Sequence, residues 1–306
     1  MDYLIRSLQK EEWQEAGKLI KRATNFWYES HGKDQIFQCN DNEMSYFCYL
    51  YETMDPGCCL VAEVDKQIAA LCFYHPRSTH YSLGILCVDP NFYGRRLGRA
   101  LIENIAKRAK EEKLNLHLIS SAQNLDSFSL YNNLGFITET VYKDVIFTVP
   151  EDYECQAISS IHGATIHDID GMVELEMNLC GQNRRKDYEF IIKHPKNWKC
   201  YVSKGEGGQI DGFLASVKHP CSSIIGPGIA SNNLAMLNLI KVQLGNYKGT
   251  GVLTLLPAEN AELHQLLRTD LKFMSNVELH VTQVLVHDAS KYVQNQGIKL
   301  PSFFPE

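Results

Sequence analysis

The feature that most limits the fold of this chain is a weak internal repeat with a spacing of about 150 residues. "QIAALCFYHP" at 67–76 and "QIDGFLASVKHP" at 209–220 share their first two residues and their final His-Pro. In both halves two helical stretches come before these strands, and a strand and a helix come after them. Solenoid repeats usually span about 20–50 residues, so this spacing indicates duplication of a whole domain. We therefore expect two domains, residues 1–149 and 150–306.

The pattern of the first half predicts an α/β fold around a mixed sheet. Apolar residues with helical spacing and short apolar runs bounded by turn residues distinguish helices from strands. The expected strands are 3–8, 58–64, 67–75, 81–89, 115–121 and 141–149, and the expected helices are 10–24, 41–54, 95–113 and 124–136.

Composition excludes several classes of function. The formal net charge of the 306 residues is −6, which does not favour a nucleic-acid partner or an anionic membrane. No stretch approaches the roughly 20 apolar residues of a membrane helix, and the N-terminus lacks an apolar signal core. We expect a cytoplasmic protein.

The ten cysteines favour a reduced protein without a metal site. Most of them lie in apolar runs, as Cys72, Cys87 and Cys200 do, where a thiol behaves as a small hydrophobic group. The adjacent pair Cys58-Cys59 does not have the spacing of a zinc ligand set. We therefore expect free thiols without disulfides, and no metal.

A candidate anion site lies in "VDPNFYGRRLGRALI", Val88–Ile102. A helix N-terminus offers unpaired N–H groups and the positive end of a dipole, and turn amides add to such a site. Gly94 and Gly98 let the backbone approach an anion closely. From Arg95 to Lys113 the segment holds seven Lys and Arg residues against three Glu, which favours a polyanionic ligand.

About thirty residues later comes "NLDSFSLYNNLGF", residues 124–136. In this order and spacing, the two stretches resemble the cofactor motif and the tyrosine-bearing helix of the GCN5-related N-acetyltransferase (GNAT) superfamily. The resemblance covers most of residues 1–148. It implies tandem GNAT-like acyl-CoA N-acyltransferase folds, with acetyl-CoA as cosubstrate of the first half.

The resemblance also implies a set of cofactor-binding residues. Backbone of Leu86, Cys87 and Val88 would pair with the pantetheine arm, and an amide near Leu86 or Cys87 would polarise the thioester carbonyl. Asn124 would hold the cofactor or a bridging water, with Ser127 near the pantetheine or pyrophosphate. The phosphates would lie on the turn formed by Tyr93, Gly94, Arg95, Arg96, Leu97, Gly98 and Arg99.

The turn departs from the family pattern. Tyr93 replaces a polar residue, and Arg96 replaces the first motif glycine, which requires a compatible φ at that position. The guanidinium of Arg96 could add a phosphate contact, so the sequence leaves open whether affinity rises or falls.

Tyr131 is implied to be the general acid that protonates the departing thiolate. The base is not evident, because Gly84 stands where many relatives carry a glutamate. His80, His75 and Glu29 are candidates, and a water chain to solvent is an alternative.

The acceptor is expected near residues 24–37, a predicted loop. Phe26, Trp27 and Tyr28 could enclose a hydrophobic or cationic acceptor, with Glu29 holding an ammonium and His75 nearby. The alternative is that these aromatic residues only pack the core.

The second half is expected to be a non-catalytic copy, since it lacks the Gly/Arg turn and carries Leu267 where the first half carries Tyr131. It could pack the sheet, wall the acceptor pocket or form a homodimer. Arg184, Arg185 and Lys186 could bind an acidic partner or simply begin a solvated helix.

Together these features predict an enzyme that acetylates a small-molecule or peptide amine by direct attack in a ternary complex, without an acetyl-enzyme. The alternatives are a non-catalytic acyl-CoA sensor and an enzyme that uses a longer acyl-CoA.

Overall fold

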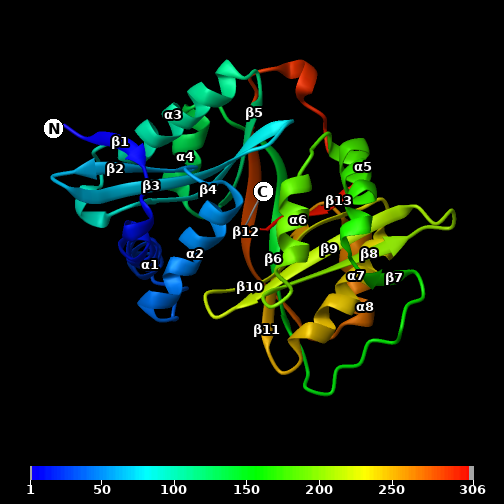
Figure 1. Ribbon diagram of the computed structural model, residues 1–306. Coiled ribbons are helices and arrows are strands. Elements are labelled where there is room, and N and C mark those ends of the chain that lie inside the picture. The colour runs from blue at the N-terminus through cyan, green and yellow to red at the C-terminus, as the bar shows by residue number, and fades with distance from the viewer. Residues whose placement is uncertain (1, 303–306) are drawn as a thin grey trace.

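The two halves of the chain share one continuous mixed sheet. The computed structural model describes residues 2–302, within which thirteen strands join in the order β1-β2-β3-β4-β5-β12-β6-β11-β10-β9-β8-β7, with β13 paired to β10 (Figure 1). The strands are β1 Leu4–Ser7, β2 Cys59–Val64, β3 Gln67–Pro76, β4 His80–Val88, β5 Asn115–Ser121, β6 Ile137–Thr148, β7 Ile161–Gly163, β8 Trp198–Lys204, β9 Ile210–His219, β10 Ser222–Ala230, β11 Gly251–Pro257, β12 Met274–Leu285 and β13 Ile298–Leu300.

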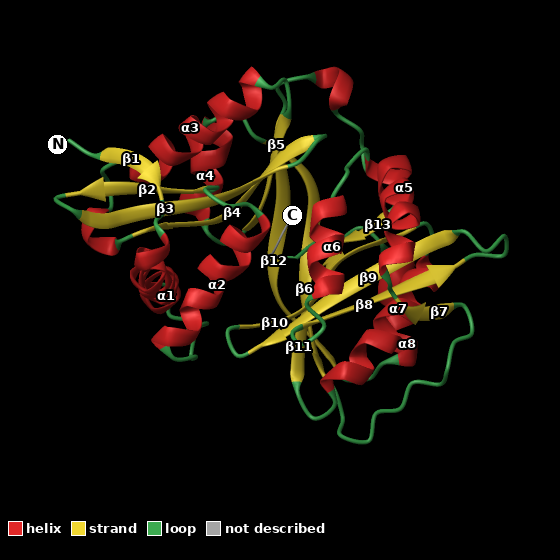
Figure 2. Ribbon diagram, viewed as in Figure 1, coloured by secondary structure: helices red, strands yellow, loops and turns green. Residues whose placement is uncertain are grey.

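Helices cover both faces of each half (Figure 2). In the first half, α1 and α2 pack on one face of the strands, and α3 and α4 pack on the other. The second half repeats this arrangement with α5 and α6 on one face and α7 and α8 on the other. The helices are α1 Trp13–Ser30, α2 Asp41–Met54, α3 Leu97–Glu111, α4 Leu125–Asn133, α5 Ile169–Cys180, α6 Arg185–Lys193, α7 Asn233–Leu244 and α8 Ala261–Asp270. The mixed α/β fold class expected from the sequence is confirmed.

The last long strands of the two halves are exchanged. β12, from the second half, lies between β5 and β6 of the first half and pairs antiparallel with both. β6 in turn pairs with β11 of the second half over seven residues. Each half therefore depends on a strand of the other for a complete sheet. The predicted boundary at 149/150 falls in the connection after β6 and remains a prediction.

Apolar packing and buried charge also join the halves. One hydrophobic core contains α1 and α2 together with Phe190, Trp198 and Val217 of the second half. Beside it, the guanidinium of Arg77 on the β3–β4 connection bridges two buried carboxylates, Asp55 and Asp187. Asp187 belongs to α6, so this ion pair crosses between the halves.

Arg184, Arg185 and Lys186 make contacts within the chain. Arg184 is fully buried and paired with Glu176, and Arg185 pairs with Asp170. Lys186 donates to Asp55 at 2.6 Å. Neither a free basic surface nor a simple solvated helix start describes this segment, since one of its cations is buried and another reaches the first half.

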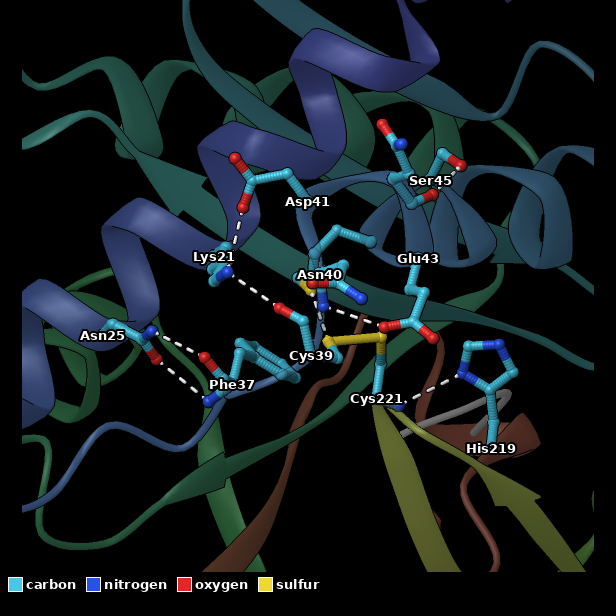
Figure 3. The surroundings of a disulfide bond; sticks show 12 residues. Lys21, Asn25, Phe37, Cys39, Asn40, Asp41, Glu43, Ser45, His219 and Cys221 are labelled. Carbon is cyan, nitrogen blue, oxygen red and sulfur yellow. Dashed lines mark hydrogen bonds and ion pairs between the residues drawn. A yellow bond between two sulfur atoms is a disulfide. The ribbon is translucent and has the colours of Figure 1, made fainter.

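A disulfide joins Cys39, in the α1–α2 connection, to Cys221, in the β9–β10 hairpin (Figure 3). The expectation that all ten cysteines are free thiols is wrong for this pair. Sequence placement could not identify it, because the two residues are 182 positions apart and meet only when the halves pack together. A crosslink closing so long a loop is worth about 5 kcal/mol in the chain-entropy model.

None of the helices within residues 2–302 is long and apolar enough to cross a bilayer.

Asp187→Asn should lower the free energy of unfolding by about 3 kcal/mol, because it leaves the buried guanidinium of Arg77 with Asp55 as its one remaining carboxylate. Urea denaturation followed by circular dichroism measures the change. Asp170→Asn is the matched control, since the Asp170 carboxylate is 86% exposed and its pair with Arg185 should contribute less than about 1 kcal/mol. Equal effects of the two variants would contradict the structural role of the buried pair.

Peptide mapping without reductant should recover a crosslinked fragment holding Cys39 and Cys221. The free cysteines Cys48, Cys59, Cys72 and Cys87 are buried and should react with a maleimide only after denaturation. Recovery of Cys39 and Cys221 as separate alkylated peptides from the native, unreduced protein would show that the disulfide is absent.

Candidate active site

The candidate site is organised by the divergence of β4 from β5. The two strands pair in parallel only at His80–Ser82, opposite Asn115–His117. Beyond this point the register of β4 against β3 shifts near Gly84, as in a β-bulge. The remainder of β4 therefore bends away and leaves one edge without a neighbouring strand.

The backbone of Leu86 and Val88 faces this open edge. Leu71 lies opposite Cys87, and the N–H of Asp89 donates to the carbonyl of Ala69 at 2.8 Å. In an antiparallel ladder alternate residues direct their polar groups to the partner strand, so Cys87 bonds to β3. Of the three residues expected to pair with pantetheine, Leu86 and Val88 are available, and Cys87 is not.

A cavity of about 170 Å³ lies at the divergence. It brings together residues that the sequence analysis singled out on separate elements, from α1, β4, the following turn and the start of α4. Its lining is Ala23, Thr24, Trp27, Tyr28, Leu86, Cys87, Val88, Tyr93, Ser121 and Asn124.

The turn after β4 has the backbone geometry of an anion nest. Gly94 has a φ of 77° and Arg96 a φ of 59°, both in the left-handed region, and α3 begins at Leu97. A Cβ at Gly98 would lie 3.4 Å from the side chain of Val88, so the first turn of α3 packs on the last residue of β4. This places helix amides beside the strand backbone that a ligand would pair with.

The basic side chains of the turn differ in their contacts. The Arg95 guanidinium lies 4.8 Å from the centre of the Phe92 ring, and Arg99 pairs with Glu103 at 3.3 Å. Arg96 is exposed, and its left-handed φ costs a non-glycine residue about 1–2 kcal/mol. The arginine therefore strains the turn, as the departure from the family pattern suggested it could.

At the start of α4, Asn124 accepts the N–H of Ser127 at 3.1 Å, and the Ser127 hydroxyl donates to the Asn124 carbonyl at 3.0 Å. Asn124 thus lines the cavity and caps the helix, whereas Ser127 does not reach the cavity wall.

Tyr131 does not line this cavity; it is buried against Phe136 in the core between the sheet and α3 and α4. Burial raises the pKa of its phenol above the ordinary value, so the group stays protonated at neutral pH. Burial likewise raises the pKa of the Cys87 thiol to about 12. A thiol with that pKa is a poor nucleophile.

The structure does not bring the candidate bases to the cavity. His80 is at the opposite end of β4, buried beside His117, and burial holds its pKa well below the ordinary value. The His75 ring is buried on Asp55, with an Nδ1–Oδ2 distance of 2.5 Å, and Glu29 is exposed and accepts from Gln35. His80 is therefore not placed to act as the base at this cavity.

At Gly84, where many relatives carry a glutamate, the ring of Tyr51 occupies the space that a side chain would need. A Cβ at Gly84 would lie 2.5 Å from Cε1 of Tyr51, whose ring stacks on Phe73 and His75. Glycine is required here because the aromatic ring occupies the space of any side chain.

The acceptor side of the cavity is helical rather than a loop, because α1 continues to Ser30. Trp27 and Tyr28 line the cavity, as expected. Phe26 is 44% exposed and packs against Tyr93 instead, with ring centres 5.9 Å apart.

The exchanged strand β12 supplies polar residues that the sequence analysis missed. The Tyr28 hydroxyl hydrogen-bonds to Glu278, and Nδ1 of His280 lies 2.7 Å from Oδ1 of Asp144. His280 is also the cross-strand neighbour of Ser121, which lines the cavity. No motif signals these residues, because they reach the first half only through strand exchange.

In the second half the equivalent edge is occupied. β13 pairs antiparallel with Gly228–Ala230 of β10, the counterpart of Leu86–Val88. Asn260 caps α8 as Asn124 caps α4, but Leu267 replaces the tyrosine and is fully buried. A polar cavity of about 650 Å³ remains beside β13, lined in part by His117, Glu139 and Lys299.

Comparisons with known proteins agree with this description. The acetyltransferase (GNAT) family model matches residues 21–136, and an acetyltransferase (GNAT) domain model matches residues 172–293. No curated protein matches the sequence.

Solved structures share the fold over nearly the whole chain. A candidate acetyltransferase of Pyrococcus horikoshii has a TM-score of 0.74 at 14% identity, covering 98% of this chain and 95% of that one. A tandem GNAT protein from the clavulanic acid biosynthesis pathway has a TM-score of 0.61 at 13% identity, covering 94% and 99%. Saccharomyces cerevisiae N-myristoyltransferase, solved with myristoyl-CoA, has a TM-score of 0.60 at 11% identity, covering 93% and 80%.

Arg96→Gly should raise the free energy of unfolding by about 0.5–1 kcal/mol, because relief of the left-handed φ is partly offset by the larger backbone entropy that glycine loses on folding. A phosphate contact by the Arg96 guanidinium would make the same substitution weaken coenzyme A binding about tenfold, and less so at high salt, because a charge-assisted hydrogen bond would be lost. Thermal denaturation and isothermal calorimetry measure the two effects. Lys66→Gly is the matched control, since Lys66 has a φ of 62° in the β2–β3 hairpin and should gain stability alone. Tighter binding by Arg96→Gly would contradict a phosphate contact.

Proposed function

This chain is a two-domain member of the GNAT superfamily, and on that basis we propose that its first half transfers an acetyl group from acetyl-CoA to an amine. The amine would attack the thioester carbon directly in a ternary complex. Holding the two substrates side by side supplies much of the rate, because it removes the entropic cost of their encounter.

The observation that carries the proposal is the open edge of β4 beside the anion turn. Leu86 and Val88 present strand backbone to a ligand, and the amides of Gly94–Gly98 lie at the end of that strand. Pantetheine has amides that can pair with a strand edge, and it continues into a pyrophosphate that suits a helix N-terminus. The second half offers no such edge, because β13 covers it.

In the proposed reaction the carbon–nitrogen bond forms first, giving a tetrahedral oxyanion, and the carbon–sulfur bond then breaks. The N–H of Leu86, which faces the cavity, would stabilise the developing oxyanion. Tyr131 would give its proton to the departing thiolate, a role that suits a phenol kept protonated by burial. The proton lost by the amine would pass to solvent, since the histidines considered as bases lie elsewhere.

A second candidate is a sensor that binds acyl-CoA without turnover. It is favoured by the ring of Tyr51, which fills the place of the family glutamate at Gly84. Release of free thiol from acetyl-CoA, measured with a panel of amines, separates the two. Tight acetyl-CoA binding with no thiol release for any amine would support the sensor. Myristoyl-CoA and octanoyl-CoA in the same assay test the choice of acyl chain.

Tyr131→Phe should lower kcat about a hundredfold while the Kd for acetyl-CoA changes less than about twofold, because only the proton of the phenol is lost. Since burial raises the pKa of Tyr131, kcat of the wild type should not fall at high pH until the pH exceeds the ordinary value of about 10. Steady-state thiol release across pH measures kcat of the variant and of the wild type, and isothermal calorimetry measures the Kd for acetyl-CoA.

Tyr49→Phe is the control for this substitution, because Tyr49 is 43% exposed on α2. Unchanged turnover in Tyr131→Phe would remove the tyrosine as the acid.

A further inference from the structure

A cation already sits beside the cavity, and it belongs to the chain itself. Nζ of Lys33 lies 5.6 Å from the ring centres of both Trp27 and Tyr28. The same ammonium donates to the side-chain oxygens of Gln123 and Glu278. We refer to Trp27, Tyr28, Gln123 and Glu278 as the cation cage.

The cation cage adjoins the candidate active site. Trp27 and Tyr28 line the cavity, and Gln123 lies in the chain between two further lining residues, Ser121 and Asn124. Glu278 hydrogen-bonds to the Tyr28 hydroxyl from the exchanged strand. A group held in the cage would therefore be in contact with the same aromatic walls as a molecule in the cavity.

The chemistry of the cage suits an alkylammonium ion. Aromatic faces attract a cation, and a carboxylate and an amide oxygen accept its N–H groups. The Glu278 side chain is only 9% exposed, so leaving it without a counter-charge would be costly. A cation in the cage therefore stabilises the ionised Glu278 carboxylate, whichever molecule provides it.

Lys33 is suited to be a replaceable occupant. Its side chain is 30% exposed and it lies in the connection between α1 and α2. That connection is anchored further along, where Asn25 bonds the backbone of Phe37 and Lys21 donates to the carbonyl of Cys39 (Figure 3). A flexible lysine stem can release its ammonium to solvent while the anchored part of the connection stays in place.

We propose that the acceptor carries a second positive charge, and that this charge displaces Lys33 from the cation cage. The inference rests on the proposed acetyl transfer. An amine must be neutral to attack a thioester, whereas the cage selects a charged group, so the two must be different nitrogens of one molecule. The acceptor class is thus an aliphatic diamine or a longer amine of that kind.

Two matched amines test the proposal. 1,5-Diaminopentane and 1-aminohexane have the same length, but the second replaces the distal ammonium with a methyl group. The readout is the ratio of their kcat/KM values, the diamine over the monoamine. Lys33→Met should raise this ratio about tenfold by removing the internal competitor, and Glu278→Gln should lower it about tenfold by weakening the cage.

The controls use the exposed pair Lys18–Glu15 on α1, which lies 2.7 Å apart. Lys18→Met and Glu15→Gln make the same changes of charge and should leave the ratio unchanged. An unchanged ratio in Lys33→Met and Glu278→Gln, or a lower ratio in Lys33→Met, would overturn the proposal. A merely structural salt bridge would instead lower the melting temperature of these variants without changing the ratio.

Calorimetry with 1,5-diaminopentane alone separates this inference from the proposed function. If no amine is acetylated but Lys33→Met binds the diamine about tenfold more tightly than the wild type, the cage is supported and acetyl transfer is not. If acetylation proceeds but the affinities of wild type, Lys33→Met and Glu278→Gln are equal, the cage is overturned and acetyl transfer stands.

Discussion

The pairing of β12 with both β5 and β6 is the interaction on which the rest of the structure depends. It closes the sheet of the first half with a strand from the second, and it brings β6 into contact with β11. The shared apolar core, the Arg77–Asp187 ion pair and the Cys39–Cys221 disulfide all reinforce this arrangement. The second half therefore completes the fold of the first half, although β13 covers the strand edge of β10 that corresponds to the open edge of β4.

The two halves share one architecture, but the diverging strand has an open edge in the first half and a covered edge in the second. In each, a strand diverges from its parallel neighbour and leaves backbone groups unpaired. Unpaired backbone must find hydrogen-bond partners, so such an edge either binds a ligand or is filled by the chain. β4 keeps its edge open beside a glycine–arginine turn, whereas β10 pairs with β13. The short strand β13, the missing glycine–arginine turn and Leu267 in place of the tyrosine together distinguish the second half from the candidate catalytic half.

Much of the fold could be predicted from local patterns. The expected bounds of α2 and β5 agree with the structure, because a capping residue or a clear apolar run marks both ends. The turn with Gly94 and Arg96 could be located because its chemistry lies within one short stretch. The start of α3 was placed two residues early, at Arg95, because the left-handed φ of Arg96 delays the helix.

The parts that could not be predicted depend on distant contacts. β12 and β13 have no counterpart among the expected strands, and their partners are set by tertiary packing rather than by sequence. The same holds for Glu278 at the site and for Tyr51 against Gly84. His80 was misjudged for a related reason: the sequence does not show that its ring is buried beside His117, at the end of β4 away from Leu86–Val88.

The exchange of strands also constrains how the protein is made. A domain of this size would ordinarily fold as soon as it leaves the ribosome, before later residues are synthesised. Here β5 and β6 can reach their shared native partner only after Leu285, the end of β12, has been translated. Until then the nascent first half exposes two sheet edges, which are targets for association with other chains. Chaperone binding during synthesis should therefore concentrate on the interval between β6 and β12.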